Sequence, residues 1–226
     1  MIIPPPCYNG KMLNLNPATI ISRIITLIIA FSVHEFSHAY IADSFGDDTP
    51  RANGRLTLNP AAHLDLMGTL MLLFAGFGWA RPVPINPYAL RRRSPSATMW
   101  VSLAGPTSNL LLAILAAIPL RLGLIPIAFQ TSGLFPTLSG FLLEFIIINL
   151  TLALFNLIPV SPLDGEKIAD YLFPPAWVRF MDTIRPYGPI ILLVLIFVLP
   201  TFGINLISWI LSPILSFILR ILLGGG

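Results

Sequence analysis

The sequence predicts an all-α integral membrane helix bundle, with about five transmembrane helices and a re-entrant, partly β-like segment between the first two. The first observation is composition: the 226 residues are 55% hydrophobic and only 10% charged, whereas about 25% of the residues in an ordinary soluble domain are charged. The second is a mean hydropathy of +0.83. The third is a series of apolar segments near the roughly 20 residues that cross a bilayer. We therefore expect a single membrane-embedded domain over residues 1–226.

The first predicted span runs from Ala18 to about Phe45 and is rich in Ile, Leu, Ala and Phe. Residues 1–17 contain four prolines and lack the basic segment that opens a secretory signal, so they are interpreted as an irregular lead-in. Gly46 to Pro50 ends the helix.

The segment from Leu64 to Ala80 is apolar, but it contains Asp65 and several glycines and is barely long enough to cross a bilayer. Arginines lie on both sides of it, and arginines are typical of cytoplasmic loops. We therefore expect it to enter the membrane and return on the same side. Its irregular backbone would then need partners from protein or from a wet cavity, because lipid supplies none.

The remaining apolar runs predict four further spans. Their ranges are Ala97–Leu120, Leu138–Ile158, Gly188–Leu199 and Ile204–Leu219. The third of these is short, and Pro200 with Gly203 allows a tight turn before the last one.

Basic residues predict the orientation of the chain. Placing residues 51–93, 167–185 and 220 on one side of the membrane gathers most of the Lys and Arg there, and such residues accumulate on the cytoplasmic side. We expect an outside amino terminus and a cytoplasmic carboxyl terminus in a prokaryotic plasma membrane, with the end of the first predicted span near the cytoplasmic side. The net charge of +3 is dispersed, which disfavours a nucleic-acid partner.

The run His34-Glu35-Phe36-Ser37-His38, near the end of the first predicted span, has the pattern H-E-x-x-H. Positions i and i+4 of a helix differ by about 40° in azimuth, so His34 and His38 can share one metal ion. Glu35 then lies beside the pair, as the general base of a zinc hydrolase does. Three ionisable residues are costly in an apolar segment, which argues against an accidental match.

A catalytic zinc site needs three protein ligands and one open position, so a further donor is required. The chain has one other histidine, His63, and ten acidic residues. Asp164 follows a predicted span in the run Pro159–Gly165, at the membrane depth expected for His34 and His38. The alternative is that Asp164 caps the next helix. The single cysteine, Cys7, excludes a multi-cysteine metal cluster.

The H-E-x-x-H motif in a first membrane helix, followed after a later helix by the run Asn156–Gly165, resembles the site-2 protease family of intramembrane zinc metalloproteases. The segments Leu58–Asp65, Trp79–Pro87 and Ala104–Asn109 look like that family's intervening segments. The resemblance covers residues 18–175, the expected catalytic core, and residues 186–223 would add transmembrane helices. Many members carry a PDZ or CBS domain; this sequence has no stretch for either and resembles a minimal form.

The resemblance implies that His34, His38 and Asp164 hold one Zn²⁺ per chain. It also implies that Glu35 is the catalytic base and that Asn156 is a polar group near the reacting carbonyl. For Asn156 the alternative is a hydrogen bond to a neighbouring membrane helix.

Three further polar residues receive structural interpretations. Asn109 is interpreted as a packing residue. His63 and Asp65 either orient a ligand or serve only as polar loop groups. Glu144 is expected at the membrane interface.

The predicted function is an intramembrane zinc endopeptidase that hydrolyses peptide bonds in the transmembrane segments of membrane proteins, as in regulated intramembrane proteolysis. Its partners would be the lipid bilayer and a transmembrane protein or peptide substrate; the oligomeric state stays open. A metal-ion transporter is the alternative, although its polar sites usually form a relay, whereas these donors gather at one depth. A non-catalytic membrane scaffold is a second alternative, which the presence of Glu35 disfavours.

Overall fold

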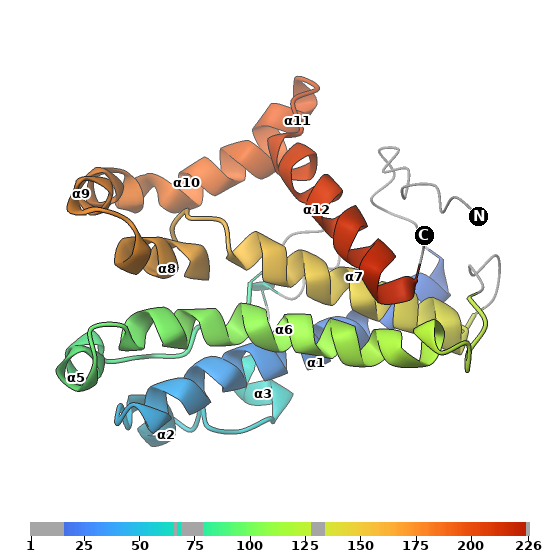
Figure 1. Ribbon diagram of the computed structural model, residues 1–226, viewed down its shortest axis with the longest axis horizontal. Helices are drawn as coiled ribbons and strands as arrows, with labels where there is room; N and C mark the ends of the chain where they lie inside the picture. Colours follow the sequence, from blue (N-terminus) through green and yellow to red (C-terminus); the bar gives the residue numbers. More distant parts are fainter. Residues whose placement is uncertain (1–15, 66, 69–78, 128–133, 225–226) are drawn as a thin grey trace.

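The chain folds into a bundle of helices (Figure 1). The computed structural model describes residues 16–65, 67–68, 79–127 and 134–224. Within these residues, five helices are long and apolar enough to cross a membrane. They are α1 (Pro17–Ser44), α6 (Ala97–Arg121), α7 (Leu138–Asn156), the helical run Pro175–Thr201 and α12 (Leu206–Leu223). The all-α membrane class and the count of five spans are confirmed.

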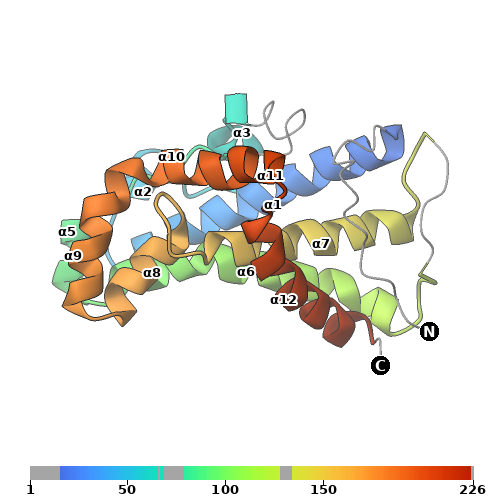
Figure 2. The same ribbon diagram turned by 90° about the horizontal axis from the view of Figure 1, so that it is seen from above.

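The core consists of α1, α6 and α7, with α6 packed against both of the others (Figures 1 and 2). Buried alanines on α6, Ala113 and Ala117, contact a buried cluster that includes Ile146 and Leu150 on α7. Small residues let two membrane helices approach closely, which explains this contact. The helix α1 begins at Pro17, and the side chain of Asn16 accepts a hydrogen bond from the Ala18 amide at 3.0 Å.

An ion pair joins the N-terminal halves of α1 and α7. The Arg23 Nε donates to Glu144 Oε1 at 2.7 Å. Glu144, which the sequence predicts at the membrane interface, therefore also forms an ion pair with another helix of the core.

In the described part of the connection between α1 and α6 lie the short helices α2 (Thr49–Ala52), α3 (Pro60–His63) and α5 (Pro87–Arg93). Leu64 and Ala80 form an isolated antiparallel bridge, and the Arg81 amide donates to the His63 carbonyl at 2.8 Å. The two ends of the segment 64–80 therefore lie side by side. Apart from this bridge the described residues form no strand, and residues 69–78 lie outside the described residues, so the re-entrant, partly β-like segment stays a prediction.

After α7 the chain forms α8 (Asp164–Leu172) and then the fourth span, which begins at Pro175 instead of the predicted Gly188. Pro175 can open a helix because its missing N–H needs no partner there. The run is divided into shorter pieces. They are α9 (Pro175–Ile184), η1 (Arg185–Tyr187), α10 (Gly188–Leu193), η2 (Val194–Val198) and α11 (Leu199–Thr201).

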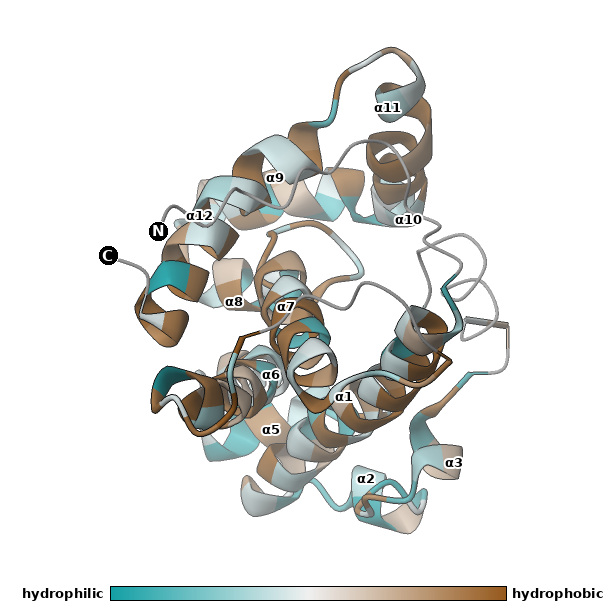
Figure 3. Cartoon of the chain, turned by 90° about the vertical axis from the view of Figure 1, so that its right-hand side faces the viewer, coloured by the Kyte–Doolittle hydropathy of each residue, from teal (hydrophilic) through white to brown (hydrophobic). Residues whose placement is uncertain are grey.

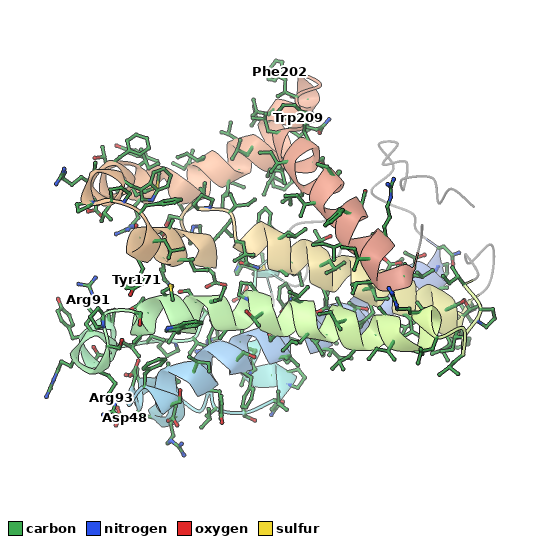
Figure 4. All side chains as sticks on the ribbon, in the orientation of Figure 1. Asp48, Arg91, Arg93, Tyr171, Phe202 and Trp209 are labelled. Atoms are coloured by element: carbon green, nitrogen blue, oxygen red, sulfur yellow. The ribbon has the colours of Figure 1, made fainter. Side chains whose placement is uncertain are left out.

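The segments α10 to α12 form a C-terminal hairpin that projects from the core (Figures 1 and 4). Phe202 and Trp209 lie at its tip, 74% and 78% exposed. Only the far end of α12 returns to the core, where Leu215 and Leu219 pack against the cluster between α6 and α7. Hydrophobic residues also cover much of α1, α7 and α10 in Figure 3. So large an apolar surface suits contact with lipid.

Candidate metal centre

Three donor atoms meet between α1 and the first residue of α8. The Nε2 atoms of His34 and His38 are 3.0 Å apart, and each lies 3.2 Å from Asp164 Oδ2. The one-turn spacing of the two histidines places both rings on the same face of α1. The structure thus brings together the three metal ligands that the sequence predicts, and this group could hold a metal ion.

The third donor, Asp164, enters this group from a helix start. It is the first residue of α8, whose N-cap is Leu163, with no capping hydrogen bond from a side chain. The alternative interpretation of Asp164 as the cap is therefore wrong. Burial alone would raise the pKa of the Asp164 carboxyl, but the charges that His38 and His34 carry when protonated hold this pKa below its usual range. An ionised carboxylate is the form that binds a metal.

The second nitrogen of each histidine ring is held by α6. The Nδ1 of His34 lies 3.2 Å from Asn109 Oδ1, and the Nδ1 of His38 lies 2.7 Å from the Val101 carbonyl oxygen. Because these oxygens accept, both Nδ1 atoms carry a hydrogen, which leaves the two Nε2 atoms that face Asp164 as the metal-binding nitrogens when the rings are neutral. A cation between the two Nε2 atoms and the Asp164 oxygen would hold these three atoms close together.

The space in front of these donors depends on a glycine. A Cβ added to Gly105 on α6 would meet Nε2 of His38 first and would lie 2.6 Å from Cε1 and Nε2 of His34. Any other residue would push the ring aside. Gly105 thus leaves room beside the donor atoms for an ion and its remaining ligands.

The donor set fits zinc. Two neutral imidazole nitrogens and one carboxylate oxygen form a common three-ligand set for catalytic Zn²⁺, with the fourth position open. The residues present therefore match the metal that the sequence predicts.

Glu35, the predicted base, follows the first histidine on α1 and is 8% exposed. Its Oε2 accepts a hydrogen bond from the Val83 amide at 3.2 Å. This contact brings the extended stretch before α5 against the side chain of Glu35.

Asn156, at the end of α7, is partly buried, and its amide nitrogen donates to the Leu152 carbonyl at 2.9 Å within its own helix. The second N–H of that amide is left for another acceptor. The role of Asn156 near a reacting carbonyl stays a prediction.

The structure corrects the interpretation of Asn109 as a packing residue, since its side chain contacts a predicted metal ligand. In the sequence, the feature that could have indicated this role is the polar amide of Asn109 in an apolar helix, shortly after Gly105. His63 and Asp65 serve the loop instead: His63 Nε2 contacts the Thr57 carbonyl at 2.7 Å, and Asp65 accepts from the Gly68 amide at 2.8 Å.

The chain is similar to known bacterial proteins. It is 45% identical over 197 residues to "Putative zinc metalloprotease YwhC" of Bacillus subtilis, with 85% of each chain covered. It is 33% identical over 181 residues to "Putative zinc metalloprotease Rip2" of Mycobacterium tuberculosis, covering 77% of this chain and 65% of Rip2. The chain thus spans just under two thirds of the length of Rip2. No family model matches the chain, and no solved structure matches it.

Proposed function

Because this chain belongs to the site-2 protease family of zinc metalloproteases, we propose that it cleaves peptide bonds within the membrane, in the transmembrane segments of protein substrates. The chain is a multi-pass membrane protein that binds zinc and acts on peptide substrates. The proposal adds where cleavage occurs and which residues perform it.

One observation carries the proposal: two of the three zinc-type donors and the carboxylate of Glu35 share one helix that is long enough to cross a bilayer. His34, Glu35 and His38 lie on α1 and are all buried. A metal site in this position works on a substrate that reaches it at membrane depth. The proposed ligands are His34, His38 and Asp164.

Bound zinc would supply Lewis-acid chemistry, polarising the scissile carbonyl and making the attacking water more acidic. Glu35 accepts the proton of that water as it attacks, and then delivers it to the leaving amine. The Val83 amide donates a hydrogen bond to Oε2 of Glu35, so Oε1 is the oxygen that accepts the proton. Asn156 would donate its second amide hydrogen to the developing oxyanion.

The substrate has to present a carbonyl that is free of its own helix. A transmembrane helix keeps its carbonyls in intrahelical hydrogen bonds, so it unwinds locally before cleavage. The stretch around Val83 lies against Glu35, and its backbone carbonyls would be the partners it offers to such an unwound strand, since its one amide hydrogen is donated to Glu35.

We assign the whole chain to a single protease domain, with its core in residues 18–175 and added helices in 186–223. In this proposal it lies in a prokaryotic plasma membrane with an outside amino terminus and a site that opens to the cytoplasm. The exposed arginines of α5, which include Arg91 and Arg93, then lie in the cytoplasmic interface (Figure 4).

The test is a comparison of wild type with Glu35→Gln in proteoliposomes that contain a model transmembrane substrate. Wild type should cleave the substrate within its membrane segment and contain one zinc per chain. The Gln variant should keep the zinc and lose cleavage by at least about 100-fold. Cleavage only in soluble loops would refute the intramembrane assignment, and zinc flux without proteolysis would favour a transporter.

A further inference from the structure

Arg55, in the loop between α2 and α3, is an unusually buried cation, with only 6% of its surface exposed. The ion pairs found among the described residues do not include it. A buried guanidinium without a carboxylate partner is costly, so its remaining contacts should explain its presence.

Those contacts are two backbone carbonyls from separate segments. The Nη1 of Arg55 donates to the carbonyl of Ala62 in α3 and, at 3.3 Å, to the carbonyl of Arg81. The same two segments are joined by the hydrogen bond from the Arg81 amide to the His63 carbonyl, at 2.8 Å. Arg55 thus fastens the end of α3 to the start of the extended stretch that leads to α5.

This extended stretch continues directly to Glu35. Val83, two residues after Arg81, donates its amide hydrogen to Glu35 Oε2 at 3.2 Å. Its neighbours Pro82 and Pro84 have no amide hydrogen and restricted backbone angles. Val83 is therefore the backbone donor available there, and its place depends on how Arg81 is held.

The charges support the same connection. Burial lowers the pKa of the Arg55 guanidinium and the charge of Arg81 lowers it further, whereas Glu35 raises it. Arg55 is therefore within electrostatic range of Glu35 without touching it.

We propose that Arg55 is a positioning residue for peptide hydrolysis, which holds residues 80–84 so that the Val83 amide fixes the orientation of the Glu35 carboxylate. This inference rests on the proposed function, because it assigns Glu35 the role of base. It distinguishes Arg55 from an arginine that merely stabilises a loop, since its loss should slow the chemical step while the metal remains bound.

The test uses Arg55→Met and Arg55→Lys in the full-length, zinc-loaded protein, with Arg51→Met as the matched control. Arg51 is a nearby arginine whose exposed side chain pairs with Asp43 at 2.7 Å. The Met variant should lower kcat by about 10- to 100-fold, the range expected when a supporting contact of a catalytic group is lost. The Lys variant should recover only part of this loss, because an ammonium does not reproduce the donor fork of arginine.

Two readouts separate positioning from general stability. Zinc content and the unfolding midpoint should stay at the wild-type values in both Arg55 variants. Hydrogen exchange of the peptide that contains residues 80–85 should become at least about tenfold faster in Arg55→Met. Because Pro82 and Pro84 carry no amide hydrogen, the signal comes from Ala80, Arg81, Val83 and Ile85. The control should match wild type in every measurement.

Three results would overturn the proposal. If both Arg55 variants match wild type in kcat, the positioning role fails while the protease assignment stands. If both lose zinc or unfold in parallel with their loss of activity, Arg55 is only a structural residue. If wild type cleaves no transmembrane substrate, the proposed function fails first, and the positioning role fails with it.

Discussion

Replacing Gly105 by alanine tests the metal centre directly. The added Cβ would lie 2.6 Å from Cε1 and Nε2 of His34, whereas ordinary contact begins at 3.4 Å. The neighbours that have to yield are two proposed ligands, since Nε2 of His38 lies even closer to the added Cβ. The substitution should therefore act on zinc before it acts on the fold.

The expected loss of zinc affinity follows from how far the added Cβ overlaps the His34 ring. The His34 ring has to move by about 0.8 Å to reach ordinary contact, while zinc–ligand distances tolerate about 0.2 Å. His34 should then be lost as a ligand, which we expect to weaken zinc binding at least about 100-fold, or about 2.7 kcal/mol. The helix should not suffer, because alanine is favoured over glycine in a helix interior by about 0.5–1 kcal/mol.

The assay is zinc competition against a chelator, with unfolding followed in parallel. Leu111→Ala is the control, since Leu111 lies on the same helix and is 54% exposed. That variant should bind zinc as wild type does. The reasoning is refuted if Gly105→Ala binds zinc within about threefold of wild type, or if the control weakens binding equally.

Three further predictions concern the partners of the site. Asn109→Leu should weaken zinc binding about 10- to 100-fold, since His34 loses its acceptor; Asn149→Leu, at another fully buried asparagine, should leave zinc titrations unchanged. Arg185→Met should lower the free energy of unfolding by about 1–3 kcal/mol, because it leaves the buried Glu166 without this partner. This loss is smaller than that of a fully buried ion pair because Arg185 is partly exposed. An unchanged denaturation curve would contradict the prediction. Removing zinc with a chelator should lower the thermal midpoint of wild type, since a ligand at 1,000 times its Kd stabilises by about 4 kcal/mol; an unchanged midpoint would show that the site is empty or uncoupled from folding.

The sequence predicted those parts of the site that depend on short-range geometry. His34 and His38 are one helical turn apart, so their convergence needed only the helix. The break after a membrane helix made Asp164 a candidate at the required depth, and the resemblance to the site-2 protease family favoured it over a helix cap. The count of five spans followed from apolar length, together with the flanking arginines that excluded the segment 64–80.

Other parts depend on contacts between distant segments. Asn109 and Gly105 became recognisable as parts of the site only when α6 was packed against α1. The buried Arg55 was missed because its acceptors are backbone carbonyls, which leave no pattern in side-chain identity. The start of the fourth span was placed too late because α9 is more polar than the rest of that run.

The three proposed ligands come from opposite ends of the catalytic core: two from the first helix and one from the residue that opens α8. An ion held by them acts as a cross-link that closes a long chain loop, so its binding contributes most after the intervening helices have assembled. During synthesis, α1 enters the bilayer before Asp164 has been made. A site built from these residues is therefore completed late, because a partly translated chain that ends before Asp164 lacks the third proposed ligand.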